Sequence, residues 1–326
     1  MLSLPFIAAR IVHFASTVMV AGIFIFLFFV ETPSLRKSND RTWPGATAFH
    51  GWLLGIAWSS LVISVASGAA WLLLLATDIT GSSLAQVISD GSAQAVLTRT
   101  QFGHDWQARF VLVVLLAVAL LRFARKRGWG LAEGCVSAAV AMGLVGTLAW
   151  SGHSGATPGL RGELHVTADV LHLIAAGAWI GGLLPLRLLL SNVEQAPGTV
   201  EVSIARDATL RFSTLGVAAV ATLIVTGIVN TWALVGTVPA LVESQYGRLL
   251  LLKLALFVVL LAVAAFNRKR LTPRLVAGYG SVTHESIDAL RRLKRNCLVE
   301  TALGLAILIV VGALGTISPG THMHGS

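Results

Sequence analysis

Residues 164–190 read LHVTADVLHLIAAGAWIGGLLPLRLLL, and this stretch decides the fold class. It is mostly apolar, and it exceeds the ~20 residues that a helix needs to cross the hydrocarbon core of a bilayer. Its first third nevertheless carries His165, Asp169 and His172. Ionisable side chains at such a depth must face protein or water rather than lipid. The stretch therefore predicts a membrane-spanning helix with a polar site at one end.

The whole chain has the composition of a multi-span membrane protein. Its 326 residues are 55% hydrophobic and 12% charged, with a mean hydropathy of +0.79, whereas soluble domains carry about 25% charged residues. We expect an all-α polytopic bundle that forms a single transmembrane domain over residues 1–326. Eight stretches are long and apolar enough to span a membrane, namely 6–31, 49–77, 107–125, 131–150, 164–190, 209–235, 248–267 and 297–317.

The positive charge of the chain, +9 at neutral pH, is distributed by loop. Eighteen lysine and arginine residues are assigned to the loops that follow the odd-numbered spans. Six are assigned to the opposite side of the membrane, where both termini also lie. Cytoplasmic loops carry the excess of Lys and Arg, so both termini are predicted to face the outer, periplasmic side. The net positive charge is thus explained by the orientation of the spans in the membrane, and we expect no nucleic-acid partner. We find no glycine-rich phosphate loop and predict no enzyme activity.

The histidines gather on the predicted outer side, where seven of the nine fall. At 3.6 residues per turn, His165, Asp169 and His172 share one stripe of a helix. His165 and His172 are ~10.5 Å apart along the axis, so neighbouring members can share an ion but all three cannot. The candidate metal ligands are His13, His153, His165, Asp169, His172 and His322.

The ligand chemistry points to copper. Imidazole binds copper, zinc, iron and nickel, whereas thiolate and thioether select Cu(I). Sulfur is scarce on the outer side, where the tail His322-Met323-His324 is the one mixed group. This set fits a copper ion from an oxidising compartment, and zinc fits it by ligand type as well. The alternative is a b-type haem redox protein with His13 and His172 as axial ligands, and a proton relay through Asp169 is a third.

Each candidate also fits a purely structural role. His165 suits a membrane interface, and His13 suits packing between helices. Asp169 and His172 suit a hydrogen-bonded pair that joins two helices, and the tail suits a disordered end.

The chain resembles the copper resistance protein D (CopD) family over almost its whole length. The stretches that carry the resemblance are HFASTVMVAG (13–22), TRTQFGHDWQAR (98–109), GHSG (152–155), DVLHLIAAGAWIGGLLPL (169–186), FSTLGVAAVATLIVTGIVNTW (212–232), YGRLLLLKLALFVVLLAVAAFNR (246–268) and ISPGTH (317–322). The family's usual tail has Pro-Pro where this chain has Ser318-Pro319, and this departure weakens the assignment of His322.

The resemblance implies a multi-pass protein of the bacterial inner membrane that takes part in copper homeostasis and resistance by importing copper into the cytoplasm. It also implies a separate small periplasmic copper-binding partner, because the family often acts beside such a protein or is fused to it, and this chain contains no fused domain of that kind.

Overall fold

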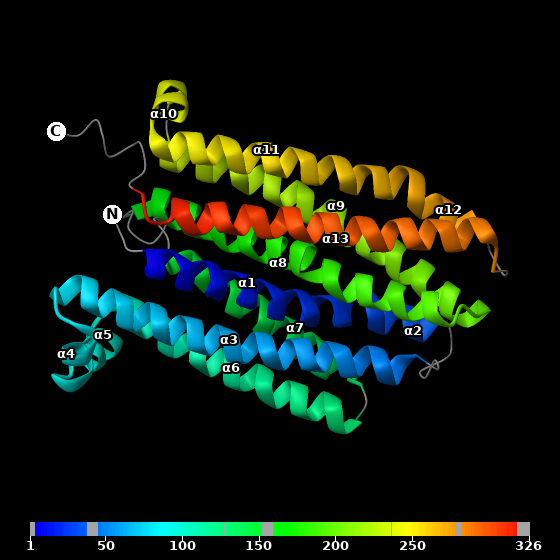
Figure 1. The fold of residues 1–326 in the computed structure, drawn as a ribbon, viewed down its shortest axis with the longest axis horizontal. Helices are drawn as coiled ribbons and strands as arrows, with labels where there is room; N and C mark the ends of the chain where they lie inside the picture. The colour runs from blue at the N-terminus through cyan, green and yellow to red at the C-terminus, as the bar shows by residue number, and fades with distance from the viewer. Residues whose placement is uncertain are drawn as a thin grey trace.

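The computed structural model is a bundle of long helices (Figure 1). It describes residues 4–37, 45–126, 128–151, 159–235, 237–277 and 282–317. Within these ranges, eight helical segments are long and apolar enough to cross a membrane, and no strand occurs. The expected all-α membrane fold with eight spans is therefore confirmed.

Five of the spans are single helices, and three consist of consecutive helical segments. The single helices are α3 (Ala46–Thr80), α6 (Gln101–Lys126), α8 (Gly159–Gln195), α9 (Thr199–Val235) and α13 (His284–Leu314). The composite spans are α1 (Leu4–Phe26) with η1 (Leu27–Glu31) and α2 (Thr32–Lys37), α7 (Leu131–Gly146) with η2 (Thr147–Ser151), and α11 (Gln245–Phe266) with η4 (Asn267–Leu271) and α12 (Thr272–Ala277). Three short helices, α4 (Leu84–Ser89), α5 (Ser92–Arg99) and α10 (Val238–Glu243), lie in the connections.

The first residue of α1 and the last residue of α13 lie at the same end of the bundle (Figure 1). We call this the termini end, where α1 begins and α13 finishes, and we call the opposite end, with α2 and α12, the far end. The short helices α4, α5 and α10 lie at the termini end. That the termini end faces the periplasm stays a prediction from the Lys and Arg distribution.

Several helices continue well beyond the apolar stretches that predict them. Arg187, Arg206 and Arg211, which the sequence places in a loop, lie inside α8 and α9. An apolar window marks the part of a helix that crosses hydrocarbon, and the helix itself can continue into the polar zone. Arg206, for example, is packed inside the bundle and is 6% exposed.

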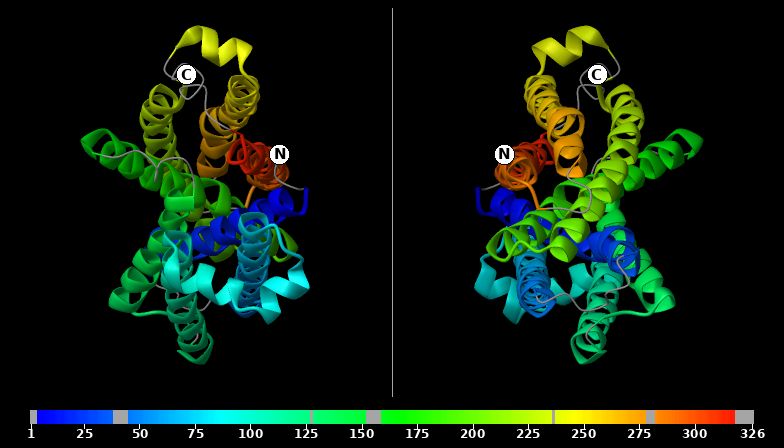
Figure 2. Two further views of the ribbon diagram at one scale, coloured as in Figure 1. Left: turned by 90° about the vertical axis from the view of Figure 1, so that its left-hand side faces the viewer. Right: turned by 90° about the vertical axis from the view of Figure 1, so that its right-hand side faces the viewer.

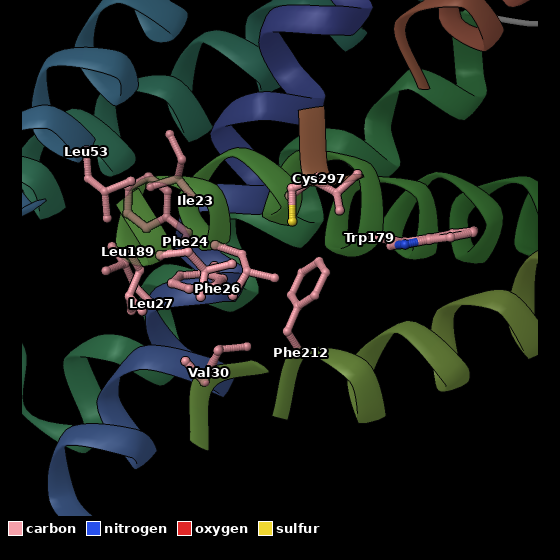
Figure 3. Close-up of a cluster of buried hydrophobic side chains, with 14 of the residues drawn as sticks. Ile23, Phe24, Phe26, Leu27, Val30, Leu53, Trp179, Leu189, Phe212 and Cys297 are labelled. Carbon is pink, nitrogen blue, oxygen red and sulfur yellow. The ribbon is translucent and has the colours of Figure 1, made fainter. Parts of the chain in front are cut away.

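α1 and α8 form the centre of the bundle, and α11 lies at its periphery. Within the 18-residue apolar segment of each span, 72% is buried for α1 and 67% for α8, against 11% for α11. The central pair crosses at two glycines, because a Cβ on Gly22 would lie 2.1 Å from the carbonyl carbon of Gly181. Small residues permit this close approach of helices in lipid. The main apolar cluster packs around this crossing, with Phe24 and Phe26 facing Leu189 and Phe212 (Figure 3).

Two spans share an unusual local design at the far end. Both η1 and η4 are π-helical turns, and both are followed by Thr-Pro, at Thr32-Pro33 and at Thr272-Pro273. In each case the threonine N–H bonds to a carbonyl five residues earlier. A proline has no N–H to continue the α-helical ladder, and π-helix occurs mostly as such single turns within a longer helix.

Candidate metal site

A cavity of about 650 Å³ lies in the half of the bundle nearer the termini end. Its walls come from two helix pairs, because α9 packs on α8 and α11 packs on α13. Seen along the bundle, α9 and α11 stand apart and are joined by α10 (Figure 2). The lining is mostly apolar, with a few polar side chains, which is the usual character of a binding site in a membrane bundle.

The three polar residues of the predicted stripe on α8 all line this cavity. His165, Asp169 and His172 share the face of α8 that the helical period predicts. His165 is 4% exposed and interacts electrostatically with Asp169 one turn below it. The structure thus brings together three of the six predicted ligands.

His172 is held in one orientation by α9. Its Nδ1 lies 2.9 Å from the Thr226 hydroxyl, and that hydroxyl donates its own proton to the Thr222 carbonyl at 2.6 Å. The hydroxyl must therefore accept from His172, so Nδ1 carries the imidazole proton. Nε2 is left with its lone pair on a ring that lines the cavity. This is the arrangement of a metal-binding histidine, whose second nitrogen donates to a fixed partner.

Asp169 has partners on two further helices. Asn230 of α9 donates its Nδ2 to the Asp169 carboxylate at 3.2 Å. Lys253 and Tyr246 of α11 interact with Asp169 electrostatically, and both line the cavity. A carboxylate at this depth is costly without such neighbours. Asp169 therefore sits between an amide, a phenol and an ammonium group.

His13 faces a different part of the bundle. Its Nδ1 donates to the Ser64 carbonyl of α3 at 2.9 Å, and its ring packs against Trp71 and Trp106 at 5.7 and 5.8 Å between ring centroids. Its Nε2 is buried and has no hydrogen-bond partner among the described residues. Arg109, which is 1% exposed, acts on it electrostatically.

His13 and His172, the predicted pair of haem ligands, thus face different neighbours, α3 for His13 and α9 for His172. His13 is not among the side chains that line the cavity.

The remaining predicted ligands, His153 and His322, lie outside the described residues. Within the part of the chain that the structure covers, no three His, Cys, Asp or Glu side chains come close enough to hold one metal ion together. This agrees with the ~10.5 Å separation of His165 and His172 along the helix. Within the described residues the α8 stripe does not form a closed three-ligand site, and the interaction seen along it joins His165 to Asp169.

Lys253 and Tyr246 are two polar cavity residues near Asp169 that the sequence analysis did not assign to the site. Lys253 counts there only among the charges of the outer side, although it lies inside the predicted span 248–267, as it does inside α11. The available signal was a single charge inside the apolar run LLLLKLALFVVLL (249–261). An ionisable residue in such a run is a functional candidate by default.

The fold and the cavity define a polytopic membrane protein whose embedded site presents imidazole and carboxylate groups. Comparison with known proteins identifies it further. Residues 1–163 match the family described as "Copper resistance protein D-like, N-terminal domain", and residues 206–314 match "Copper resistance protein D". The chain is 31% identical over 325 residues to "Copper resistance protein D" of Pseudomonas syringae pv. tomato, an alignment that covers 96% of each chain. The chain belongs to the copper resistance protein D family.

Two further relatives support this assignment. "Inner membrane protein YebZ" of Escherichia coli (strain K12) is 28% identical over 320 residues, which cover 98% of this chain and all of the relative. "Copper transport protein CutJ" of Bacillus subtilis (strain 168) is 25% identical over 311 residues, and this chain spans about half of its length. No solved structure matches the chain significantly. The predicted family is confirmed, and the chain is a multi-pass protein of the bacterial inner membrane.

Proposed function

We propose that this protein is a copper permease that takes copper into the cytoplasm and so serves copper homeostasis and resistance. Copper enters the cavity from the termini end, which faces the periplasm, and binds on the α8 stripe. The observation that carries the proposal is the fixed orientation of the His172 ring, which lines the cavity. Its Nδ1 is bound to Thr226, so the lone pair of Nε2 points away from that partner. The names of two relatives, which refer to copper resistance and copper transport, support it.

The stripe suits stepwise handling of one ion at a time. His165 with Asp169, and Asp169 with His172, each offer one imidazole and one carboxylate one turn or less apart. Copper binds strongly to such N/O sets, and water fills the remaining positions of a site that is open to a cavity. A carboxylate shared by two positions lets an ion move from the His165 side to the His172 side without leaving its anionic ligand.

Lys253 has a defined role in this proposal. In the metal-free state its ammonium group offsets the Asp169 charge, because an uncompensated carboxylate is costly at this depth. An arriving copper ion supplies the same compensation, so metal and ammonium compete for Asp169. Release of copper inward then restores the Lys253–Asp169 interaction.

We assign His13 to packing rather than to copper. The buried guanidinium group of Arg109 acts on His13 electrostatically. Its positive charge opposes a metal cation at Nε2. His153 and His322 extend the entry site on sequence grounds, and a separate periplasmic copper-binding protein is the proposed donor.

A copper flux assay in proteoliposomes tests the proposal. The variant His172→Ala should lose copper uptake and at least one bound copper per chain. His284→Ala is the matched control, since His284 is an exposed histidine at the start of α13, at the far end. Uptake and copper content equal to those of the wild type in His172→Ala would refute the entry site.

A further inference from the structure

The cavity is larger and more apolar than a metal ion alone requires. Its volume of about 650 Å³ falls in the range of sites that enclose an organic ligand, roughly 300–1,000 Å³. Most of its wall consists of aliphatic and aromatic side chains, and a purely apolar cavity surface does not bind ordered water. The polar stripe of α8 occupies only part of the wall, so the apolar remainder calls for an apolar occupant.

The cavity opens through the side of the bundle, between α9 and α11. These two helices pack on different partners, α8 and α13, and α10 joins them at the termini end (Figure 2). Ile224, Ile228 and Trp232 recur every four residues on one face of α9, and all three line the cavity although they are exposed, Ile228 to 66%. Leu254 of α11 is likewise an exposed lining residue. Because these residues belong to membrane spans, the opening that they border faces lipid.

The length of the cavity matches the depth of one lipid leaflet. Its lining residues on α11 extend from Tyr246 to Leu260, an advance of ~21 Å along the helix. One leaflet measures ~20–22 Å with its headgroup layer. Tyr246 lies at the termini end beside α10, and the deep end is apolar, with Phe257 and Leu260. A lipid that enters from the side therefore fits with its headgroup at the termini end and one acyl chain at the deep end.

Arg10 is a buried cation at the termini end of the cavity that lacks an anion. It lines the cavity and is 5% exposed, and its Nε has no hydrogen-bond partner among the described residues. Its guanidinium group lies against Gly315, where a Cβ would come within 1.9 Å of Nη2, and Cζ is 4.9 Å from the centroid of the Trp71 ring. No acid of the described chain pairs with Arg10, whereas Asp105 interacts electrostatically with Arg109 nearby.

The charge of the cavity favours an anionic lipid over a zwitterionic one. Among the described lining residues, Arg10 and Lys253 carry two positive charges and Asp169 carries one negative charge, which leaves +1 with neutral histidines. A phosphodiester monoanion makes this sum zero, and guanidinium groups bind phosphate oxygens strongly. A zwitterionic lipid would bring a further cation into the same space.

We propose that the cavity binds one anionic phospholipid from the leaflet at the termini end, with its phosphate on Arg10 and one acyl chain between α9 and α11. The chain forms the missing wall of the cavity toward the bilayer. The phosphate offsets the Arg10 charge, which otherwise opposes a copper cation in the same cavity. The lipid site itself does not depend on the proposed permease function.

Native mass spectrometry of the full-length protein tests the headgroup contact. Dioleoyl phosphatidylglycerol is added to delipidated protein in detergent, and dioleoyl phosphatidylcholine serves as the zwitterionic comparison. Wild type should retain one phosphatidylglycerol per chain in preference to phosphatidylcholine. Arg10→Gln should bind it roughly tenfold or more weakly, and Arg10→Lys, which keeps the charge, should bind it more tightly than Arg10→Gln. Arg248→Gln is the matched control and should behave as wild type, because Arg248 is an exposed arginine near the start of α11 that does not line the cavity.

Brominated lipid tests the position of the acyl chain. Bromine on a chain quenches a tryptophan that it contacts, and Trp179 lines the cavity at 2% exposure, away from bulk lipid. A small fraction of phosphatidylglycerol with brominated chains, in nanodiscs of phosphatidylcholine, should therefore quench wild type more than Trp179→Phe.

Three results would overturn the lipid site. They are equal binding of phosphatidylglycerol by wild type and Arg10→Gln, equal quenching of wild type and Trp179→Phe, and an unfolding temperature that inorganic phosphate raises as much as phosphatidylglycerol does. The last result would assign Arg10 to a free anion. None of these measurements involves copper, so they stand whatever the flux assay of His172→Ala shows.

Discussion

Replacing Thr226 with valine would remove the hydroxyl that holds the His172 ring while nearly keeping the shape of the side chain. Thr226 is 5% exposed, and its hydroxyl accepts from His172 Nδ1 while donating to the Thr222 carbonyl. In Thr226→Val, the Nδ1–H loses this acceptor. The imidazole is then free to rotate or to move its proton to Nε2, the nitrogen that the proposal assigns to copper.

The size of the effect follows from this geometry. Loss of an outer partner of a metal-binding histidine costs roughly 10- to 100-fold in metal affinity, which is about 1.4–2.7 kcal/mol. The buried Nδ1–H that loses its acceptor costs a further ~1–3 kcal/mol of folding free energy. Copper affinity and thermal stability should therefore both fall, and Thr226→Ser, which keeps the hydroxyl, should preserve most of each.

The assay is a copper titration against a chromophoric chelator in nanodiscs, paired with ¹⁵N NMR of labelled histidine to report which ring nitrogen carries the proton. Thr231→Val is the matched control, because Thr231 also lines the cavity but its hydroxyl donates to the Gly227 carbonyl of its own helix. Wild-type copper affinity in Thr226→Val, or an equal loss in Thr231→Val, would refute the tautomer argument.

Three further predictions test other parts of the account. Lys253→Met should lower the unfolding temperature of the metal-free protein, and added copper should raise that temperature more than it does in wild type; equal copper-induced shifts would contradict the proposed competition for Asp169. Gly181→Ala should destabilise the bundle by ~1–3 kcal/mol, since its Cβ would lie 2.2 Å from the Val18 carbonyl oxygen, whereas Gly216→Ala meets nothing within 4 Å and serves as the control. The purified protein should show no Soret band in its visible spectrum, and a band of bis-imidazole character would instead establish the haem alternative.

Much of the fold could be predicted from the sequence, because lipid imposes strong rules on it. A helix that crosses hydrocarbon must be long and apolar, so the eight spans follow from hydropathy alone. The true helix ends do not follow from it, as Arg187 and Arg211 show by lying inside helices. Where a helix leaves the hydrocarbon, hydropathy falls, but the backbone hydrogen bonds continue.

The candidate site was predictable where one helix supplies it. His165, Asp169 and His172 share a stripe because helical geometry fixes their relative angles. The partners from other helices, such as Thr226, Asn230 and Lys253, depend on which helices pack together, and one sequence does not encode that in any short pattern. Glu300 of α13 lies within the predicted span 297–317, but its contact with Trp179 of α8 depends on how the two helices pack.

His13 shows most clearly what a single sequence can and cannot determine. The span α1–η1–α2 recurs as α11–η4–α12 with a constant offset of 240 residues from the π turn through the end of the short helix. In this register His13 corresponds to Lys253, since each precedes the last residue of its π turn by eighteen positions. His13 therefore occupies the position along its span that Lys253 occupies in the other. Its face is decided by packing, however: α1 is enclosed at the centre of the bundle and turns His13 toward Ser64 of α3, whereas α11 lies at the periphery and leaves Lys253 beside Asp169. The same position in two similar spans thus contributes to packing in one and lines the proposed copper site in the other.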